Sequence, residues 1–110
     1  MVERRGCDLD PIDSATGVGR TRLRSFVWPD QPDRRARLDA ALAVAARHPV
    51  VLDRADAVSW LVGALAQPVP GVVTVVTHSI MFQYLSPADR RTFLATIEAA
   101  QPAATIADDV

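Results

Sequence analysis

The sequence predicts an α/β protein built on a short parallel sheet, and three observations lead to this prediction. Short apolar runs alternate with longer segments of helical periodicity, in the order β-αα-β-α-β-α. The run at 72–76 is apolar or β-branched and carries no charge, which is typical of a strand buried on both faces of a sheet. That strand leads into the polar residues Thr77, His78 and Ser79, at the edge where open parallel sheets bind ligands.

The N-terminal segment is expected to form a strand, a turn and a helix. In residues 3–13, aspartates alternate with apolar side chains and a proline interrupts the pattern, which favours a short strand end followed by a turn. Ser14 or Thr16 is expected to cap a helix over 17–27, because serine and threonine hydroxyls accept hydrogen bonds from the first free backbone N–H groups. The Trp-Pro pair that follows ends this helix.

A second helix and a second strand come next. Asp30 or Asp33 is expected to cap a helix that ends before Pro49, with leucines and alanines recurring at helical spacing and arginines on the other face. The apolar run 50–52 is too short for a helix. It predicts a buried strand that ends at Asp53.

The second half of the chain continues the alternation. A helix is expected over 55–67, where two prolines follow, and the apolar strand comes after it. Ser86 followed by proline is a strong signal for the start of the last helix. The sequence therefore predicts a single incomplete α/β domain over residues 1–101 and a flexible C-terminal tail over residues 102–110.

Composition excludes several functional classes. The net charge is −1 with both signs interspersed, which gives no electrostatic basis for binding nucleic acid or an anionic membrane. Cys7 is the one cysteine, and His48 and His78 lack ligand spacing, so no metal site is expected. No apolar run approaches the ~20 residues that span a bilayer, and the N-terminus lacks the apolar stretch of a signal peptide. The protein is therefore expected to be soluble and cytoplasmic.

The residues after the apolar strand are the first candidates for chemistry. His78 is the candidate catalytic residue, as an acid, a base or a substrate clamp, and Ser79 and Tyr84 are candidates for a substrate pocket. Ser79 lacks the G-x-S-x-G motif of an activated nucleophile. Other interpretations are a hydrogen-bonded structural histidine, a serine that caps a short turn through 81–84, and a tyrosine that packs under the last helix.

The strand ends resemble the middle of a class I S-adenosylmethionine-dependent methyltransferase, which implies a partial Rossmann-like three-layer fold. In that family an acidic residue after the second strand binds the ribose hydroxyls, and the segment GCDLDPID places Asp8 or Asp10 there. In the same family a second acidic residue lies near the adenine. The segment VVLDRADAVSWL places Asp56 at this position, with Asp53 as the alternative. The fourth strand, VVTHSIMFQYL, brings His78 near the reacting centre. The alternative for the early aspartates is a role in turns and caps.

The segments RRGCDLDPID, FVWPDQPDRRARLDAALAVA and VVTHSIMFQYL are similar to a bacterial family, the domain of unknown function 2332 family. The resemblance covers nearly the whole chain up to about Ala100. Members are longer and carry an upstream strand with a glycine-rich loop, whereas here Gly17-Val18-Gly19 follows an acidic strand. The resemblance therefore implies a truncated, central fragment, with S-adenosylmethionine binding possible in full-length relatives only.

Two functions are expected from these observations. The first is a fragment of a methyltransferase-like α/β domain without independent catalysis. The alternative is a small noncatalytic α/β module whose open sheet edges are covered by self-association or by a partner chain.

Overall fold

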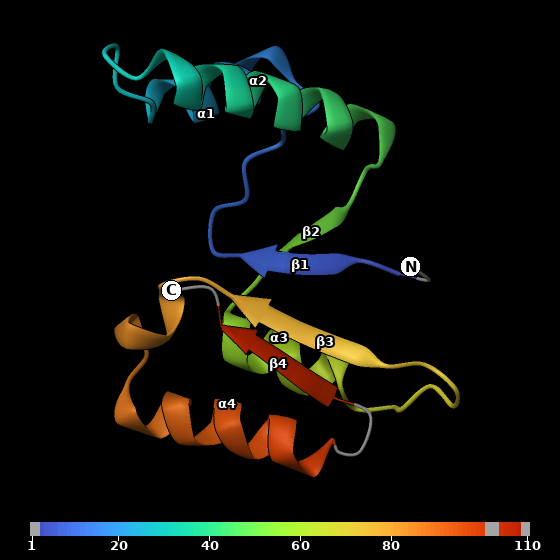
Figure 1. The fold of residues 1–110 in the computed structure, drawn as a ribbon. Helices are drawn as coiled ribbons and strands as arrows, with labels where there is room; N and C mark the ends of the chain where they lie inside the picture. Colours follow the sequence, from blue (N-terminus) through green and yellow to red (C-terminus); the bar gives the residue numbers. More distant parts are fainter. Residues whose placement is uncertain (1–2, 101–103, 109–110) are drawn as a thin grey trace. The chain divides into compact units, whose positions relative to one another are not determined.

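The computed structural model describes residues 3–100 and 104–108, and it confirms the mixed α/β class. The chain divides into two compact units, Met1–Ala55 and Asp56–Val110, and each is described by itself. Each unit contains a two-stranded parallel sheet (Figure 1). The single domain over 1–101 stays a prediction of the sequence analysis.

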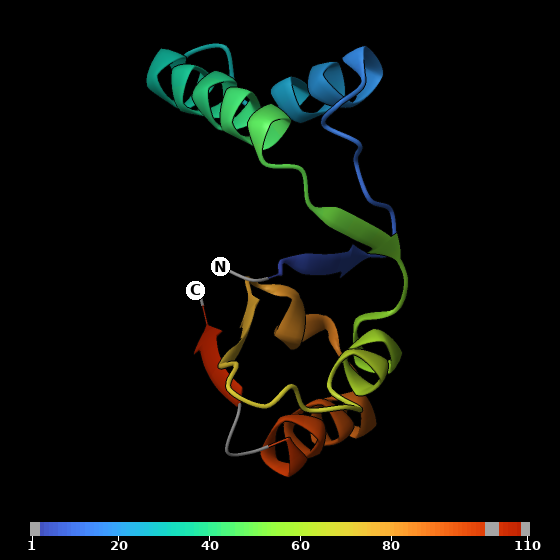
Figure 2. The same ribbon diagram turned by 90° about the vertical axis from the view of Figure 1, so that its right-hand side faces the viewer.

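In the first unit, two helices connect two parallel strands. The elements are β1 (Arg5–Asp8), α1 (Gly17–Ser25), α2 (Pro32–Arg47) and β2 (Val51–Arg54). Strand β1 pairs with β2 from Arg5 opposite Val51 to Asp8 opposite Arg54, so both strands end at the same edge. Helices α1 and α2 lie side by side (Figure 2), and Arg24 Nε donates to Asp39 Oδ1 at 2.9 Å between them.

Local side-chain chemistry sets the start of α1. Thr16 is its N-cap, and the Thr16 hydroxyl accepts a hydrogen bond from the Gly19 backbone N–H at 2.9 Å. A Cβ atom added at Gly19 would lie 1.7 Å from the Asp13 carbonyl oxygen, so only glycine allows this close approach. Gly19 is therefore explained by the packing of the first helical turn, whereas a Cβ atom at Gly17 would meet only the Arg20 side chain, at 3.9 Å.

Helix α2 begins differently from the prediction. Pro32 occupies its first turn as expected, but the N-cap is Gln31, whose side chain makes no capping hydrogen bond. Neither Asp30 nor Asp33 caps the helix. Proline fixes φ and lacks a backbone N–H group, so it suits a first turn in which the N–H groups have no helical partner.

In the second unit, helices α3 and α4 form a small apolar core. The elements are α3 (Ala57–Ala64), β3 (Thr74–His78), the 3₁₀ helix η1 (Met81–Tyr84), α4 (Pro87–Ala99) and β4 (Ala104–Asp108). Ser86 caps α4 as predicted, since its hydroxyl accepts from the Asp89 N–H at 3.1 Å. The buried core residues are Val58, Leu61, Phe93 and Ile97.

The sheets differ from the single three-stranded sheet that the sequence predicts. Residues 104–108, expected to belong to a flexible tail, form β4, which pairs in parallel with β3 from Thr74 opposite Ala104 to His78 opposite Asp108. The segment Thr105-Ile106 is β-branched, and such residues favour extended backbone. Residues 102, 103, 109 and 110 of the expected tail lie outside the described residues.

Strand β3 is not buried on both faces. Along it, partly buried and exposed residues alternate: Val76 packs against the core, whereas Val75 is 56 % exposed. Val51 and Leu52 of β2 are also at least half exposed. The apolar run predicted burial correctly for one face only, because successive side chains of a strand point to opposite faces. In the described part of the chain, no helix is long and apolar enough to cross a bilayer.

Candidate functional site

The candidate residues fall into both units. In the first unit, Asp8 ends β1 and Asp10 lies two residues after it. The others belong to the second unit: Asp56, His78, Ser79 and Tyr84. The structure therefore brings Asp8 together with Asp10. Asp56 lies at the start of α3, His78 ends β3, Ser79 follows it, and Tyr84 ends η1.

Asp8 is the last residue of β1, and its own turn holds it in place. The Asp8 carbonyl accepts the Ala55 backbone N–H at 3.0 Å, which extends the pairing of β1 and β2 by one residue. Asp8 Oδ1 accepts the Asp10 backbone N–H at 2.8 Å. An aspartate that bonds the N–H two residues later forms a local turn, so this contact also ends the strand.

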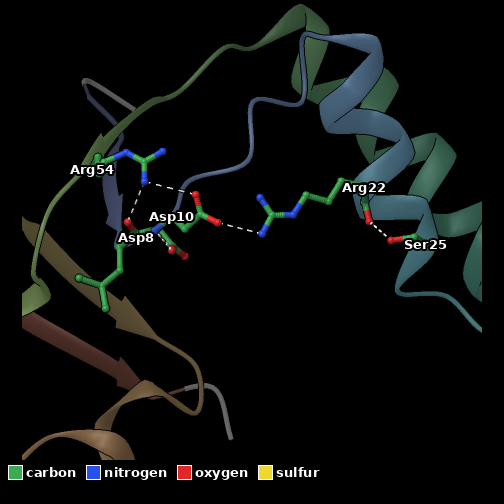
Figure 3. Close-up of polar contacts among 6 residues, drawn as sticks. Asp8, Asp10, Arg22, Ser25 and Arg54 are labelled. Atoms are coloured by element: carbon green, nitrogen blue, oxygen red, sulfur yellow. Dashed lines mark hydrogen bonds and ion pairs between the residues drawn. The ribbon is translucent and has the colours of Figure 1, made fainter.

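The Asp10 carboxylate lies between two guanidinium groups (Figure 3). Arg22 Nη2 of α1 donates to Asp10 Oδ2 at 2.9 Å, and Arg54 Nη1 of β2 lies 3.3 Å from Asp10 Oδ1. The hydrogen bond from Arg22 and then the charge of Arg22 lower the pKa of Asp10, and Arg54 adds smaller effects of the same sign. Arg54 Nη1 also donates to the Leu9 carbonyl at 3.2 Å. Both Asp10 oxygens therefore face positive charge.

Arg22 and Arg54 are not among the residues that the sequence indicates. All twelve basic residues are arginines, so an arginine at a given position carries little information about a site. Arg54 directly follows the predicted strand end at Asp53, and parallel pairing of that strand with the first one places it at the edge that holds the aspartates. That signal was present in the sequence. The contact with Arg22 depends on how α1 packs, which no local pattern specifies.

Asp56 is the N-cap of α3. Its Oδ2 accepts the Ser59 backbone N–H at 3.0 Å and the Ser59 hydroxyl at 2.8 Å. The backbone hydrogen bond, followed by the hydroxyl, lowers the pKa of Asp56. One Asp56 carboxylate oxygen thus caps the N-terminus of α3. Serine, threonine and aspartate have this structural role at many helix starts.

His78 ends β3 within a cluster of aromatic rings. Its ring stacks against Phe82 of η1 with centroids 5.9 Å apart, and it lies nearly perpendicular to the Phe93 ring of α4 with centroids 5.5 Å apart. The Arg90 guanidinium carbon lies over the Phe82 ring, 5.6 Å from its centre. Aromatic pairs in these arrangements attract one another beyond simple apolar burial. His78 is therefore packed as part of the partly buried layer over the core.

The loop after His78 has an unusual backbone. Ile80 has φ of +66°, a conformation that β-branched residues rarely adopt, and it occupies the N-cap position of η1. The short turn through 81–84 forms as predicted, but Ser79 does not cap it. The Ser79 carbonyl instead accepts the Met81 N–H at 2.7 Å. Tyr84 is 79 % exposed, so the interpretation that it packs under the last helix is wrong.

Other features of a binding site are sparse in the described residues. They contain no group of three or more His, Cys, Asp or Glu residues that is able to hold a metal ion. A hollow of about 220 Å³ lies at the turn between α1 and α2, and none of the candidate residues contributes to it. Its lining consists of Val27, Trp28, Pro29, Gln31, Pro32 and Arg35.

Comparison with known proteins gives one result. The family model described as an uncharacterized protein conserved in bacteria, DUF2332, matches residues 1–108. No curated protein and no solved structure matches the chain. Because the family match spans nearly the full length, in agreement with the segments noted in the sequence, this chain belongs to the DUF2332 family of bacterial proteins.

Proposed function

We propose that the chain is part of a Rossmann-like, methyltransferase-like α/β domain that binds the ribose of a nucleoside cofactor at the end of β1, without independent catalysis. The observation that carries this proposal is the parallel pairing of β1 with β2, connected through two helices, with Asp8 as the last residue of β1. In sheets of this kind, ligands bind beyond the carboxyl ends of the strands.

The chemistry of the strand end supports a hydroxyl-bearing ligand. A carboxylate is an acceptor with two oxygens, so it suits a pair of neighbouring ribose hydroxyls that both donate. Asp8 and Asp10 are the two candidates in the first unit. In the second unit, Asp56 is the candidate on the adenine side, and His78, with Ser79 and Tyr84 as pocket residues, belongs near the reacting centre of full-length relatives.

Calorimetric titration of the 110-residue protein with S-adenosylhomocysteine tests the proposal. We expect binding in the micromolar range, weakened at least about tenfold by Asp8→Asn, because a hydrogen bond to a charged acceptor is stronger than one to a neutral acceptor. Asp30→Asn is the matched control, since it removes one exposed carboxylate between the helices and leaves β1 intact. An absence of heat at millimolar ligand would overturn the proposal for this polypeptide.

A second candidate function is a noncatalytic module that associates with a second copy of the chain. Its support is the exposure of apolar strand residues: Val51 is 58 % exposed, Leu52 50 % and Val75 56 %. Unpaired sheet edges and exposed apolar surface both favour association with another chain. Light scattering after size exclusion decides this candidate, which predicts a dimer at micromolar concentration and fails if the protein is a well-folded monomer there.

A further inference from the structure

The two aspartates at the end of β1 have different electrostatic surroundings. Asp10 faces a guanidinium group at each carboxylate oxygen, at 2.9 Å from Arg22 and 3.3 Å from Arg54. Asp8 uses Oδ1 for the Asp10 N–H, and no described residue donates to Asp8 Oδ2. A ligand diol would have to displace two cations from Asp10, whereas it meets a free acceptor oxygen at Asp8.

The two arginines reach Asp10 from separate elements. Arg22 lies in the last turn of α1, and Arg54 is the last residue of β2. Arg54 also binds the Leu9 carbonyl, so it holds the turn by its backbone as well as through Asp10. Figure 3 shows the turn between the two guanidinium groups. The chain after β1 is thereby attached to the neighbouring strand on one side and to the following helix on the other.

We infer that Asp10, Arg22 and Arg54 form an ion-pair latch that positions the Asp8 carboxylate for its ligand. The link between the latch and Asp8 is short, because the Asp10 N–H is the group that Asp8 Oδ1 accepts. When the latch fixes residue 10, it fixes the donor that orients the Asp8 side chain. Asp10, Arg22 and Arg54 are therefore positioning residues, and Asp8 is the residue that contacts the ligand. The ligand part of this inference rests on the proposed function.

A readout without ligand tests the latch itself. In the wild-type protein, ¹⁵N relaxation is expected to give order parameters of about 0.85 for residues 8–10, and Asp10→Asn or Arg22→Gln is expected to lower them below about 0.6. Asp10→Glu keeps the charge and is expected to restore most of the order. Unchanged order parameters in both loss variants would overturn the latch.

A double-mutant cycle with S-adenosylhomocysteine tests the positioning. Asp10→Asn alone is expected to weaken binding about threefold to tenfold, but to have no further effect in a protein that already carries Asp8→Asn, because groups that act through one another are not additive. Equal effects in both backgrounds would overturn the positioning role, since they indicate a general structural loss. If the variants lower the order parameters while the wild type binds no nucleoside, the latch is retained and the proposed function is lost.

Discussion

At the scale of single residues, several side chains have roles that local chemistry explains. Thr16, Asp56 and Ser86 each cap a helix. The side-chain oxygen of each accepts a hydrogen bond from the backbone N–H three residues later. Serine and threonine at such starts were visible in the sequence, whereas Asp56 was interpreted as a ligand residue. The ambiguity is physical, because a carboxylate at a helix N-terminus suits either a backbone N–H or a ligand hydroxyl.

Gly19 gives the sharpest prediction at this scale. Gly19→Ala is expected to lower the free energy of unfolding by about 1–3 kcal/mol, since the added methyl group collides with the Asp13 carbonyl at 1.7 Å. Gly17→Ala is the control, because its Cβ would meet only the end of the Arg20 side chain at 3.9 Å. Urea unfolding followed by circular dichroism measures both. Equal losses in the two variants would contradict this account of the α1 N-terminus.

Asp56 predicts a dependence of stability on pH. Its folded-state pKa is lowered from 3.8 by the bonds from Ser59, so its contribution is present above that pH and is lost as the pH falls below it. Asp56→Ala is expected to cost about 1 kcal/mol at pH 7, and less at pH 3. Asp56→Ser keeps a capping oxygen and is the control. A cost that is the same at both pH values would contradict the charged cap.

At the scale of elements, the stability of the second unit depends on which side chains of α4 pack against α3. Phe93 is 4 % exposed and lies in the core, whereas its neighbour Leu94 is 45 % exposed. Phe93→Ala is expected to destabilise the unit by about 3–5 kcal/mol, because it leaves a cavity, and Leu94→Ala by less than about 1.5 kcal/mol. Thermal unfolding of both variants measures the difference. Similar losses would show that this assignment of the buried face is wrong.

Elements whose signals are local were predictable from the sequence, and pairings between distant segments were not. The last helix follows from its capping serine and the proline after it, and the turn at 81–84 follows from short-range pattern, although no side chain caps that turn. Strand β4 was missed because an alanine-rich, acidic segment resembles a tail until it pairs with β3. Helix α3 is shorter than predicted, Ala57–Ala64, because an apolar stripe does not mark where a helix frays.

At the scale of the whole molecule, the sequence predicted the α/β class and the order of elements up to α4, as well as the family. It did not predict two separate two-stranded sheets, because strand order depends on contacts between residues far apart in the chain. Of the candidate residues, it named Asp8 and Asp10, because they follow a recognisable short strand pattern. It missed the two arginine partners of Asp10, because the choice among twelve arginines requires the register of the strands and the packing of α1.

The positive φ of Ile80 has a consequence for how this protein responds to laboratory selection. A left-handed backbone costs a side-chain-bearing residue about 1–2 kcal/mol more than glycine, and the Ile80 side chain is 59 % exposed. Ile80→Gly is therefore expected to raise the melting temperature, and a screen for heat resistance should recover it early. If the loop beside His78 contacts a ligand, the same variant should bind that ligand less well, so thermal gain and binding loss would appear together. A lower melting temperature for Ile80→Gly would show that isoleucine is the better residue at this bend.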